Sequence, residues 1–250
     1  EQNNWFAASD NLVLKRFLNP AIENKKVAGV IGDFGFGTVN ETGRIDTLKL
    51  VKAYRNFLMD EKCIRFEKFE HLKLKVLAEK ITYKEIECKQ VVFCEGFGIK
   101  GNPFFKDLPL EEAKGELLTI HAPELNIDFL LKSALFLIPL GDNRYKVGAT
   151  FNHVDKTATP SEKGKLELVD KLKKVINVPY EIIDQTAGIR PTTNDRRPFI
   201  GQHKEHNRLA VLNGLGTRGV MLAPTMARNL FNCIEKDIAL DLEVDIKRFQ

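Results

Sequence analysis

The chain has 250 residues, of which 43% are hydrophobic and 29% charged, and its formal net charge is +4 at pH 7. This composition is ordinary for a globular protein of one large or two small domains and excludes a disordered or fibrous chain. The longest apolar stretch, residues 129–140, is interrupted by Lys132 and Ser133. It is far shorter than the roughly 20 residues that a membrane-spanning helix needs, so a membrane protein is excluded.

The cysteines indicate the compartment and the absence of a metal site. Their spacing is not that of a structural zinc site, and the first residues do not have the composition of a secretory signal. We therefore expect buried, reduced cysteines and a cytoplasmic protein. Because the first residue is not methionine, we also expect a piece of a longer protein. The cysteines are Cys63, Cys88, Cys94 and Cys233.

The first half of the chain predicts a strand, a helix and a ribbon. Residues 1–26 are polar with scattered aromatic side chains, whereas residues 27–38 are apolar and glycine-rich and predict a strand that ends in a turn. Apolar residues recur at helical spacing from Thr47, a candidate cap, to about Asp60. Alternating residues then predict an antiparallel ribbon. Its expected strands are residues 63–66, 72–77, 81–86 and 91–94.

The second half predicts a hairpin, two helices and further strands. Residues 101–112 contain glycine and proline and predict a loop. The sequence Gly141-Asp142-Asn143 predicts a hairpin turn, and a second amphipathic helix is expected from Ser161 to Val175. The remaining expected strands are residues 116–121, 135–139, 145–150, 180–184, 186–189 and 209–212, and the last helix is residues 221–235.

A glycine-rich sequence, Gly214-Leu215-Gly216-Thr217-Arg218-Gly219, follows a predicted strand and opens the last predicted helix. Backbone N–H groups at such a helix start favour a negatively charged or electron-rich ligand group. The spacing is that of a dinucleotide-binding loop, but only residues 220–250 follow it, too few for the complete unit. Two interpretations stay open: a tight turn without a ligand, or a helix start aimed at a cofactor whose main site lies elsewhere.

Arg190 is the second candidate functional residue. It follows an apolar predicted strand and precedes Pro191, which cannot continue the hydrogen bonding of a central strand. A guanidinium at a strand end can bind a carboxylate through two parallel hydrogen bonds. The alternative is an ordinary ion pair, with Asp195 as the candidate partner. The histidines do not cluster, and His203 and His206 lie in a polar segment that predicts a solvated turn.

Seven short motifs occur in an order that resembles one family, the FAD-dependent amine and amino-acid oxidoreductases related to D-amino-acid oxidase, glycine oxidase and sarcosine oxidase. The resemblance runs from about residue 40 to residue 232. The motifs are residues 43–47 (GRIDT), 91–96 (VVFCEG), 114–118 (KGELL), 136–139 (FLIP), 147–150 (VGAT), 188–191 (GIRP) and 213–219 (NGLGTRG).

The resemblance implies an α/β (α+β) fold, in which part of a Rossmann-like FAD-binding domain is interleaved with an antiparallel-sheet substrate domain. The substrate domain would comprise residues 1–40 and 106–186, and the remainder of the FAD-binding domain residues 41–105 and 187–250. The family opens with a nucleotide-binding βαβ unit, and nothing before residue 40 resembles it. We therefore expect a fragment that by itself holds no FAD.

The resemblance also implies site residues. Arg190 resembles the residue that pairs with the substrate carboxylate, and Gly96 the glycine at which the chain passes close to FAD. Glu95 stands where the family has small residues, and its charge would repel the cofactor's phosphates unless the side chain turns away. The residues that resemble the segment against the flavin ring are Gly214, Gly216, Thr217, Arg218, Gly219 and Val220.

The implied function is oxidation of the C–N bond of an amino acid or secondary amine by hydride transfer to FAD. A small-molecule amine or amino acid is the expected partner, with no metal and no membrane. One alternative is the oxidase domain of tRNA wobble-uridine modification, because the glycine-rich turn also resembles that subgroup; nucleic acid is otherwise not an expected partner. The other alternative is a non-catalytic fragment that folds without FAD and binds a partner.

Overall fold

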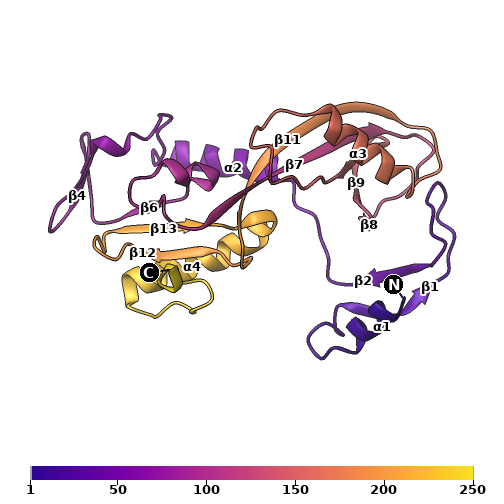
Figure 1. Cartoon of the computed structure of the whole chain (residues 1–250), viewed down its shortest axis with the longest axis horizontal. Helices are drawn as coiled ribbons and strands as arrows, with labels where there is room; N and C mark the ends of the chain where they lie inside the picture. Colours follow the sequence, from indigo (N-terminus) through magenta and orange to yellow (C-terminus); the bar gives the residue numbers. More distant parts are fainter. Residues whose placement is uncertain (1, 250) are drawn as a thin grey trace. The chain divides into compact units, whose positions relative to one another are not determined.

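The structure is a computed structural model that describes residues 2–249, and it divides into two compact units (Figure 1). Unit 1 consists of Glu1–Val51, Gly115–Phe151 and Thr159–Ala187. Unit 2 consists of Lys52–Lys114, Asn152–Ala158 and Gly188–Gln250. Both units are assembled from segments far apart in the sequence. The assignment of these segments to a substrate domain and an FAD-binding domain stays a prediction.

The largest sheet has five strands in the order β11-β7-β10-β9-β8. The strands β9 and β10 form the predicted hairpin, and Asp142 and Asn143 in its turn have φ of 51° and 55°, as a tight two-residue turn requires. Antiparallel pairing joins β7 to β10, β10 to β9, and β9 to β8. The strands are β7 (Leu110–His121), β8 (Leu131–Lys132), β9 (Phe136–Gly141), β10 (Arg144–Gly148) and β11 (Glu181–Thr193).

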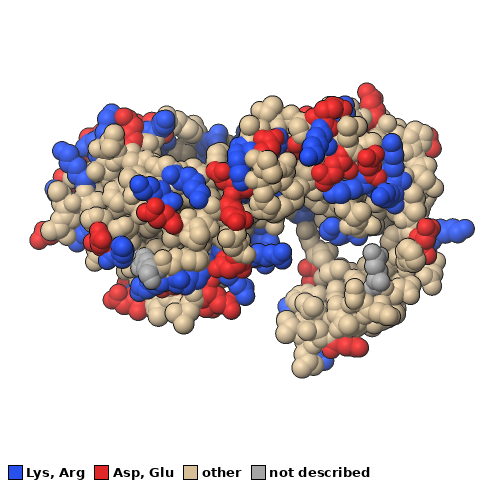
Figure 2. Space-filling view, in the orientation of Figure 1, with Lys and Arg blue, Asp and Glu red and all other residues tan. Residues whose placement is uncertain are grey.

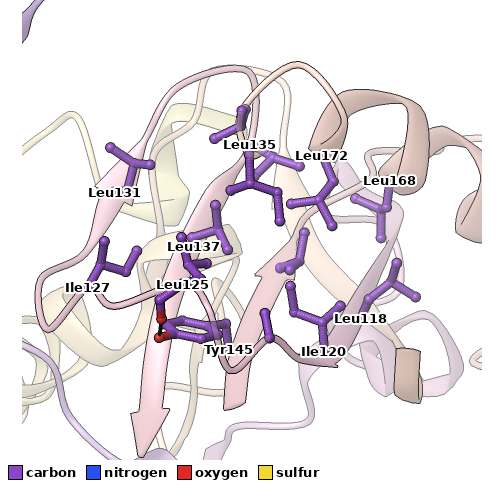
Figure 3. Close-up of a cluster of buried hydrophobic side chains, with 14 residues drawn as sticks. Leu118, Ile120, Leu125, Ile127, Leu131, Leu135, Leu137, Tyr145, Leu168 and Leu172 are labelled. Carbon is purple, nitrogen blue, oxygen red and sulfur yellow. Dashed lines mark hydrogen bonds between the residues drawn. The ribbon is translucent and has the colours of Figure 1, made fainter. Parts of the chain in front are cut away.

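The core of unit 1 lies between this sheet and helix α3 (Glu162–Leu172), at the helix predicted from Ser161 (Figure 3). Leu168 and Leu172 of α3 are fully buried against apolar side chains of the sheet. The Tyr145 hydroxyl donates a hydrogen bond to the backbone carbonyl of Leu125 within the same cluster. The helix ends at Leu172, three residues before the predicted end, although Val175 and Ile176 continue the apolar spacing and are buried in the same cluster. Ile176 instead forms a β-bridge with Val30.

A buried carboxylate fixes the start of α3. The side chain of Glu116 accepts hydrogen bonds from the Ser161 backbone N–H at 2.8 Å, the Ser161 hydroxyl at 2.6 Å and the Gln185 amide at 2.7 Å. The Ser161 hydroxyl oxygen in turn accepts from the Gly164 N–H at 3.1 Å and caps the helix. Glu116 is only 3% exposed, so these hydrogen bonds replace the hydration that its buried carboxylate lacks.

The N-terminal part of unit 1 differs from the prediction. Of the strand expected over residues 27–38, Val30 forms only a single bridge with Ile176, and strand β2 (Phe36–Val39) begins within the expected turn. The chain bends before β2 because Gly29 and Gly35 take φ of +78° and +76°. The structure also forms α1 (Gln2–Asp10) and β1 (Leu18–Glu23) in the polar stretch. The hairpin β1–β2 packs on Trp5, so closely that a side chain at Gly37 would lie 2.6 Å from the indole ring.

Unit 2 contains a second sheet in the order β12-β13-β6. The central strand β13 pairs antiparallel with β12 and parallel with β6, so the segment expected at residues 209–212 is confirmed as a strand. The strands are β6 (Val91–Phe93), β12 (Phe199–Gln202) and β13 (Leu209–Asn213). Helix α4 (Gly219–Lys236) packs on this sheet, with Met226 in one buried cluster with Ile200 of β12.

The predicted ribbon is confirmed in part. The strands β3 (Leu74–Val76), β4 (Ile81–Tyr83) and β5 (Ile86–Cys88) form an antiparallel sheet. Residues 63–66 contain no strand, and β6 leaves the ribbon to pair with β13. Leu72, expected at the start of the strand over residues 72–77, belongs instead to a short 3-10 helix, η1 (His71–Lys73), and is 98% exposed.

Helix α2 spans Thr47–Asp60, as the apolar spacing predicts, and the boundary between the units falls within it. The expected cap was wrong: Asp46, not Thr47, accepts the hydrogen bond from the Lys49 N–H, at 3.0 Å. Asp46 is placed to do so because it precedes the first helical residue, where a side-chain oxygen reaches the third N–H. The remaining short 3-10 helices are η2 (Gly96–Gly101), η3 (Gly216–Arg218) and η4 (Ile246–Phe249).

Two further expectations are corrected. Strand β11 runs through Pro191 to Thr193, so the proline does not end the strand. The proline is tolerated because β11 is at the edge of its sheet, where the missing N–H does not remove a hydrogen bond to a neighbouring strand.

The cysteines are not buried, in contrast to the expectation. Cys63 and Cys94 are exposed and the other two are half-buried, since both exposed residues lie in irregular chain after α2 and β6. Within residues 2–249, no helix has the length and apolar character to cross a membrane.

The Glu116 network predicts a loss of stability in unit 1. Replacing Ser161 with alanine removes the helix cap and one hydrogen bond to a buried carboxylate. We expect the free energy of unfolding to fall by about 1–2 kcal/mol. Urea unfolding followed by the fluorescence of the single tryptophan, Trp5, measures this free energy of unfolding, because Trp5 belongs to unit 1. Ser133→Ala, at an exposed position, is the control, and an equal loss in both variants would contradict the proposed role.

Candidate functional site

Two glycine turns leave the same edge of the β12-β13-β6 sheet in unit 2. The strands β6 and β13 are parallel neighbours, so their carboxyl ends meet at one edge. Gly96 follows β6 with φ of +57°, and Gly214 and Gly216 follow β13 with φ of +69° and +56°. These left-handed conformations are readily adopted only by glycine. The carboxyl ends of parallel strands are where open α/β sheets bind ligands.

Asn213 joins the two turns. Its side-chain amide donates a hydrogen bond to the Gly96 carbonyl at 2.8 Å, and its side-chain oxygen accepts one from the Gly214 N–H at 2.8 Å. Asn213 is the last residue of β13 and is 3% exposed. A buried amide that uses both of its groups in this way fixes the spacing of the two turns. Asn213 was not among the predicted site residues, and its one signal in the sequence is its place between an apolar strand and a glycine.

The turns leave backbone open to a ligand. A side chain at Gly96 would meet no atom within 4 Å, and at Gly216 and Gly219 the nearest atoms would be 3.7 and 3.6 Å away. Gly214 differs, since a side chain there would lie 2.7 Å from the methyl group of Thr193. The glycines at 96, 216 and 219 therefore give access to the backbone, whereas Gly214 permits close packing.

Helix α4 begins at this edge. Its cap residue, Arg218, makes no side-chain hydrogen bond to the first turn of α4. Thr217 and Arg218 are exposed, and Val220 is 50% exposed. The positive end of an 18-residue helix and its N–H groups favour a ligand group that carries negative charge.

Arg190 lies on the face of β11 that meets the glycine-rich turn. Alternate residues of a strand point to the same face of its sheet, so Gly188, Arg190 and Thr192 lie on one face of β11. A side chain built at Gly216 would lie 3.7 Å from the Thr192 methyl group, which places this face against the turn. The space over Gly188 is open to at least 4 Å. Burial lowers the pKa of the Arg190 guanidinium, which stays protonated at neutral pH.

The ion pair suggested for Arg190 is made by another arginine. The carboxylate of Asp195 binds Arg248, with 3.0 Å between Nε and Oδ2. Burial raises the pKa of Asp195, but hydrogen bonds from the Arg197 N–H and from Arg248 outweigh it and hold the pKa below its usual value. Arg248 is the residue that binds Asp195 because the C-terminal 3-10 helix η4 brings its guanidinium beside the turn that contains Asp195.

Glu95 is turned toward two partners. Its carboxylate lies 2.8 Å from Nε2 of His71 and accepts a hydrogen bond from the Asn102 amide at 2.7 Å. Asn102 is fully buried, and its oxygen also accepts hydrogen bonds from the Phe104 and Phe105 N–H groups. Two partners fix the carboxylate of Glu95, and its charge is satisfied beside the Gly96 turn. His71 and Asn102 could not be identified as partners of Glu95 from the sequence, since they are 24 and 7 residues away and carry no local signal.

The Asn213 bridge predicts a local effect. Asn213→Ala leaves the half-buried Gly96 carbonyl and the buried Gly214 N–H without their partner, and we expect it to cost about 1–3 kcal/mol of stability. Hydrogen exchange measured by mass spectrometry would show faster exchange of residues 94–98 and 213–219. Asn194→Ala, at an exposed position, is the control. Unchanged exchange in both segments would mean that Asn213 does not hold the turns.

Comparison with known proteins relates this geometry to one family. The family described as FAD dependent oxidoreductase matches residues 1–232. The glycine oxidase of Bacillus subtilis (strain 168) is 27% identical over 205 residues, which are 76% of this chain and 54% of that protein. The tRNA 5-methylaminomethyl-2-thiouridine biosynthesis bifunctional protein MnmC of Marinobacter nauticus is 25% identical over 141 residues, covering 51% of this chain and 22% of that protein.

The fold agrees with these matches. The crystal structure of glycine oxidase from Geobacillus kaustophilus superimposes with a TM-score of 0.70 at 23% sequence identity, over 83% of this chain and 59% of that chain. The fold is therefore the mixed α/β fold of glycine oxidases over part of their length, with a large antiparallel sheet. This chain spans little more than half the length of the glycine oxidases it matches. With the family matched over residues 1–232, the chain belongs to the FAD-dependent oxidoreductases and is similar to glycine oxidase.

Proposed function

We propose that this chain forms the substrate-orienting part of an enzyme that oxidises the C–N bond of an amino acid or secondary amine by hydride transfer to FAD. The observation that carries the proposal is the position of Arg190 on the face of β11 against which the Gly216 turn packs. The proposal combines the two candidate features of the sequence, Arg190 and the glycine-rich turn at residues 214–219, in one site. When bound, FAD supplies the acceptor for the hydride.

The backbone around the turns fits a flavin. Open space above Gly96, Gly216 and Gly219 lets a planar ring approach the chain more closely than a side chain would allow. The N–H groups at the start of α4 would hold the negative charge that a reduced flavin carries, and the helix dipole favours that charge. Thr217, Arg218 and Val220 would complete this contact. The Glu95 carboxylate does not oppose it, because His71 and Asn102 bind it.

Arg190 would bind and orient the substrate. Its guanidinium can hold a carboxylate by two parallel hydrogen bonds, which fixes both the position and the direction of an amino acid. Gly188, two residues earlier on the same face, leaves room beside it for the substrate. Orientation of the C–H bond toward the hydride acceptor accounts for rate enhancement without a dedicated base. The site then needs no catalytic histidine.

The carboxylate role predicts a selective kinetic defect. In the full-length enzyme, Arg190→Ala removes a charge-assisted interaction worth about 1.5–3 kcal/mol. We expect kcat/KM for a carboxylated amine to fall by about 10- to 150-fold. Arg190→Lys should recover part of the loss, since an ammonium group cannot form the paired hydrogen bonds. An amine without a carboxylate is the control, and an equal loss for both substrates would contradict this role.

Flavin content separates the enzyme from a non-catalytic fragment. We expect the purified 250-residue chain to pass through gel filtration colourless, because the βαβ unit that grips the FAD pyrophosphate in the family has no counterpart in it. The full-length gene product should carry flavin absorbance. A yellow 250-residue chain would contradict the first expectation. A colourless full-length product would favour the alternative of a fold that binds a partner without FAD.

A second candidate is oxidation of an amine carried on a tRNA. Arg196 and Arg218 favour it: the Arg218 guanidinium donates to the Arg196 carbonyl at 2.8 Å, and neither side chain has a carboxylate partner among residues 2–249. Two such cations beside the glycine-rich turn could bind phosphates. On the face drawn in Figure 2, however, basic side chains are interleaved with acidic ones, so no continuous basic surface supports RNA binding there. A free amino acid is therefore the preferred substrate.

A further inference from the structure

Arg248 holds one turn of unit 2 through its guanidinium. The turn is residues 194–198, which connect β11 to β12. The Nε of Arg248 binds the Asp195 carboxylate, and its Nη2 donates hydrogen bonds to the backbone carbonyls of Arg197 at 3.3 Å and Pro198 at 3.0 Å. A planar guanidinium with several donors fixes such partners in one geometry, which a flexible ammonium group does not.

The surrounding residues restrain the Arg248 side chain. Its Cζ lies 4.3 Å from the centre of the Phe249 ring and 5.4 Å from the centre of the Phe199 ring. Its Nη1 donates a hydrogen bond to the Asp245 carbonyl at 3.0 Å, and the side chain is 17% exposed. Cation–π contacts stabilise a guanidinium most where water is largely excluded. Arg248 is therefore a fixed support and not a mobile surface cation.

The turn that Arg248 holds packs on the glycine-rich turn. Thr193, the residue before it, donates from its hydroxyl to the Arg197 carbonyl at 2.9 Å, and Arg248 binds the same carbonyl. A side chain at Gly214 would lie 2.7 Å from the Thr193 methyl group, so the two turns are in close contact there. Because close-packed groups transmit strain, a displacement of residues 194–198 would reach Gly214.

A hydrogen bond also joins the two turns directly. The Arg218 guanidinium in η3 donates to the Arg196 carbonyl at 2.8 Å. Arg196 has φ of +57°, a left-handed conformation that costs energy in a residue other than glycine and persists where its surroundings hold it. Arg248 binds the residues on both sides of it, Asp195 and Arg197, and so holds this conformation.

We propose that Arg248 is a positioning residue for the candidate site: by holding residues 194–198, it fixes the glycine-rich turn at residues 214–219 in the conformation that receives the flavin. All of these residues belong to unit 2. This inference rests on the proposed function, which places the hydride acceptor at that turn. Because Arg248 acts on the cofactor side of the site, its loss should slow the oxidation of every amine, whereas the loss of Arg190 should affect carboxylated amines.

The first test compares two neighbouring positions in the 250-residue chain. Arg248→Gln removes the guanidinium, whereas Lys247→Gln removes the same charge from an exposed side chain. We expect hydrogen exchange of residues 213–219 to be about tenfold faster in Arg248→Gln and unchanged in Lys247→Gln, with residues 74–88 unchanged in both. Unchanged exchange of residues 213–219 would overturn the proposal. An equal increase in both segments would also overturn it, because it would indicate a general loss of stability.

Arg248→Lys provides a milder variant if Arg248→Gln has an altered circular dichroism spectrum. The ammonium group retains the attraction to Asp195 but cannot also reach two backbone carbonyls in the geometry of a guanidinium. We therefore expect a smaller increase in the exchange of residues 213–219. An effect of Arg248→Lys no larger than that of Lys247→Gln would overturn the proposal.

Kinetics of the full-length enzyme distinguish positioning from a general structural role. Per bound flavin, Arg248→Gln should lower kcat by about tenfold and leave KM within about twofold, because it displaces the acceptor without removing a substrate contact. The loss should be equal for an amine with a carboxylate and an amine without one. A loss confined to the carboxylated amine, or a rise in KM alone, would overturn the proposal.

Hydrogen exchange needs no bound FAD and so separates this inference from the proposed function. Faster exchange of residues 213–219 in Arg248→Gln, with no flavin in the full-length gene product, would retain the support of the turn by Arg248 and count against the oxidase. An active flavoprotein in which Arg248→Gln changes neither the exchange nor kcat would retain the oxidase and overturn the role of Arg248.

Discussion

The candidate site depends on the hydrogen bonds that Asn213 makes at the ends of two parallel strands. Because β6 and β13 are parallel, the chain leaves both at one edge, and the buried amide then sets the distance between the Gly96 and Gly214 turns. Every other feature of the site is placed relative to these turns. The start of α4 follows one of them, and the Glu95 carboxylate precedes the other.

The polar groups around the turns divide into those that are satisfied within the protein and those that remain available. Glu95 is bound by His71 and Asn102, and Asp195 by Arg248, so neither carboxylate is left to repel an anionic cofactor or substrate. The open backbone at Gly216 remains for a ligand. This division supports an electron-rich ring at the turn.

Local patterns predicted the elements whose residues decide their own conformation. Helix α2, the β9–β10 hairpin and the start of α3 near Ser161 follow from apolar spacing and turn residues, and all three were predicted. The failures involve distant contacts. Strand β6 pairs with β13, which is more than 100 residues away, and Pro191 is tolerated because β11 is an edge strand. The partners of Glu95 were equally hidden, since His71 and Asn102 carry no local signal.

The most direct test of the central claim is a crystal structure of the full-length gene product with FAD and a bound carboxylate. The account predicts that the flavin ring contacts the backbone of Gly216–Gly219 and that the Arg190 guanidinium forms paired hydrogen bonds with the carboxylate. A flavin bound away from this turn, or an Arg190 that binds a protein carboxylate while the ligand lies elsewhere, would contradict it.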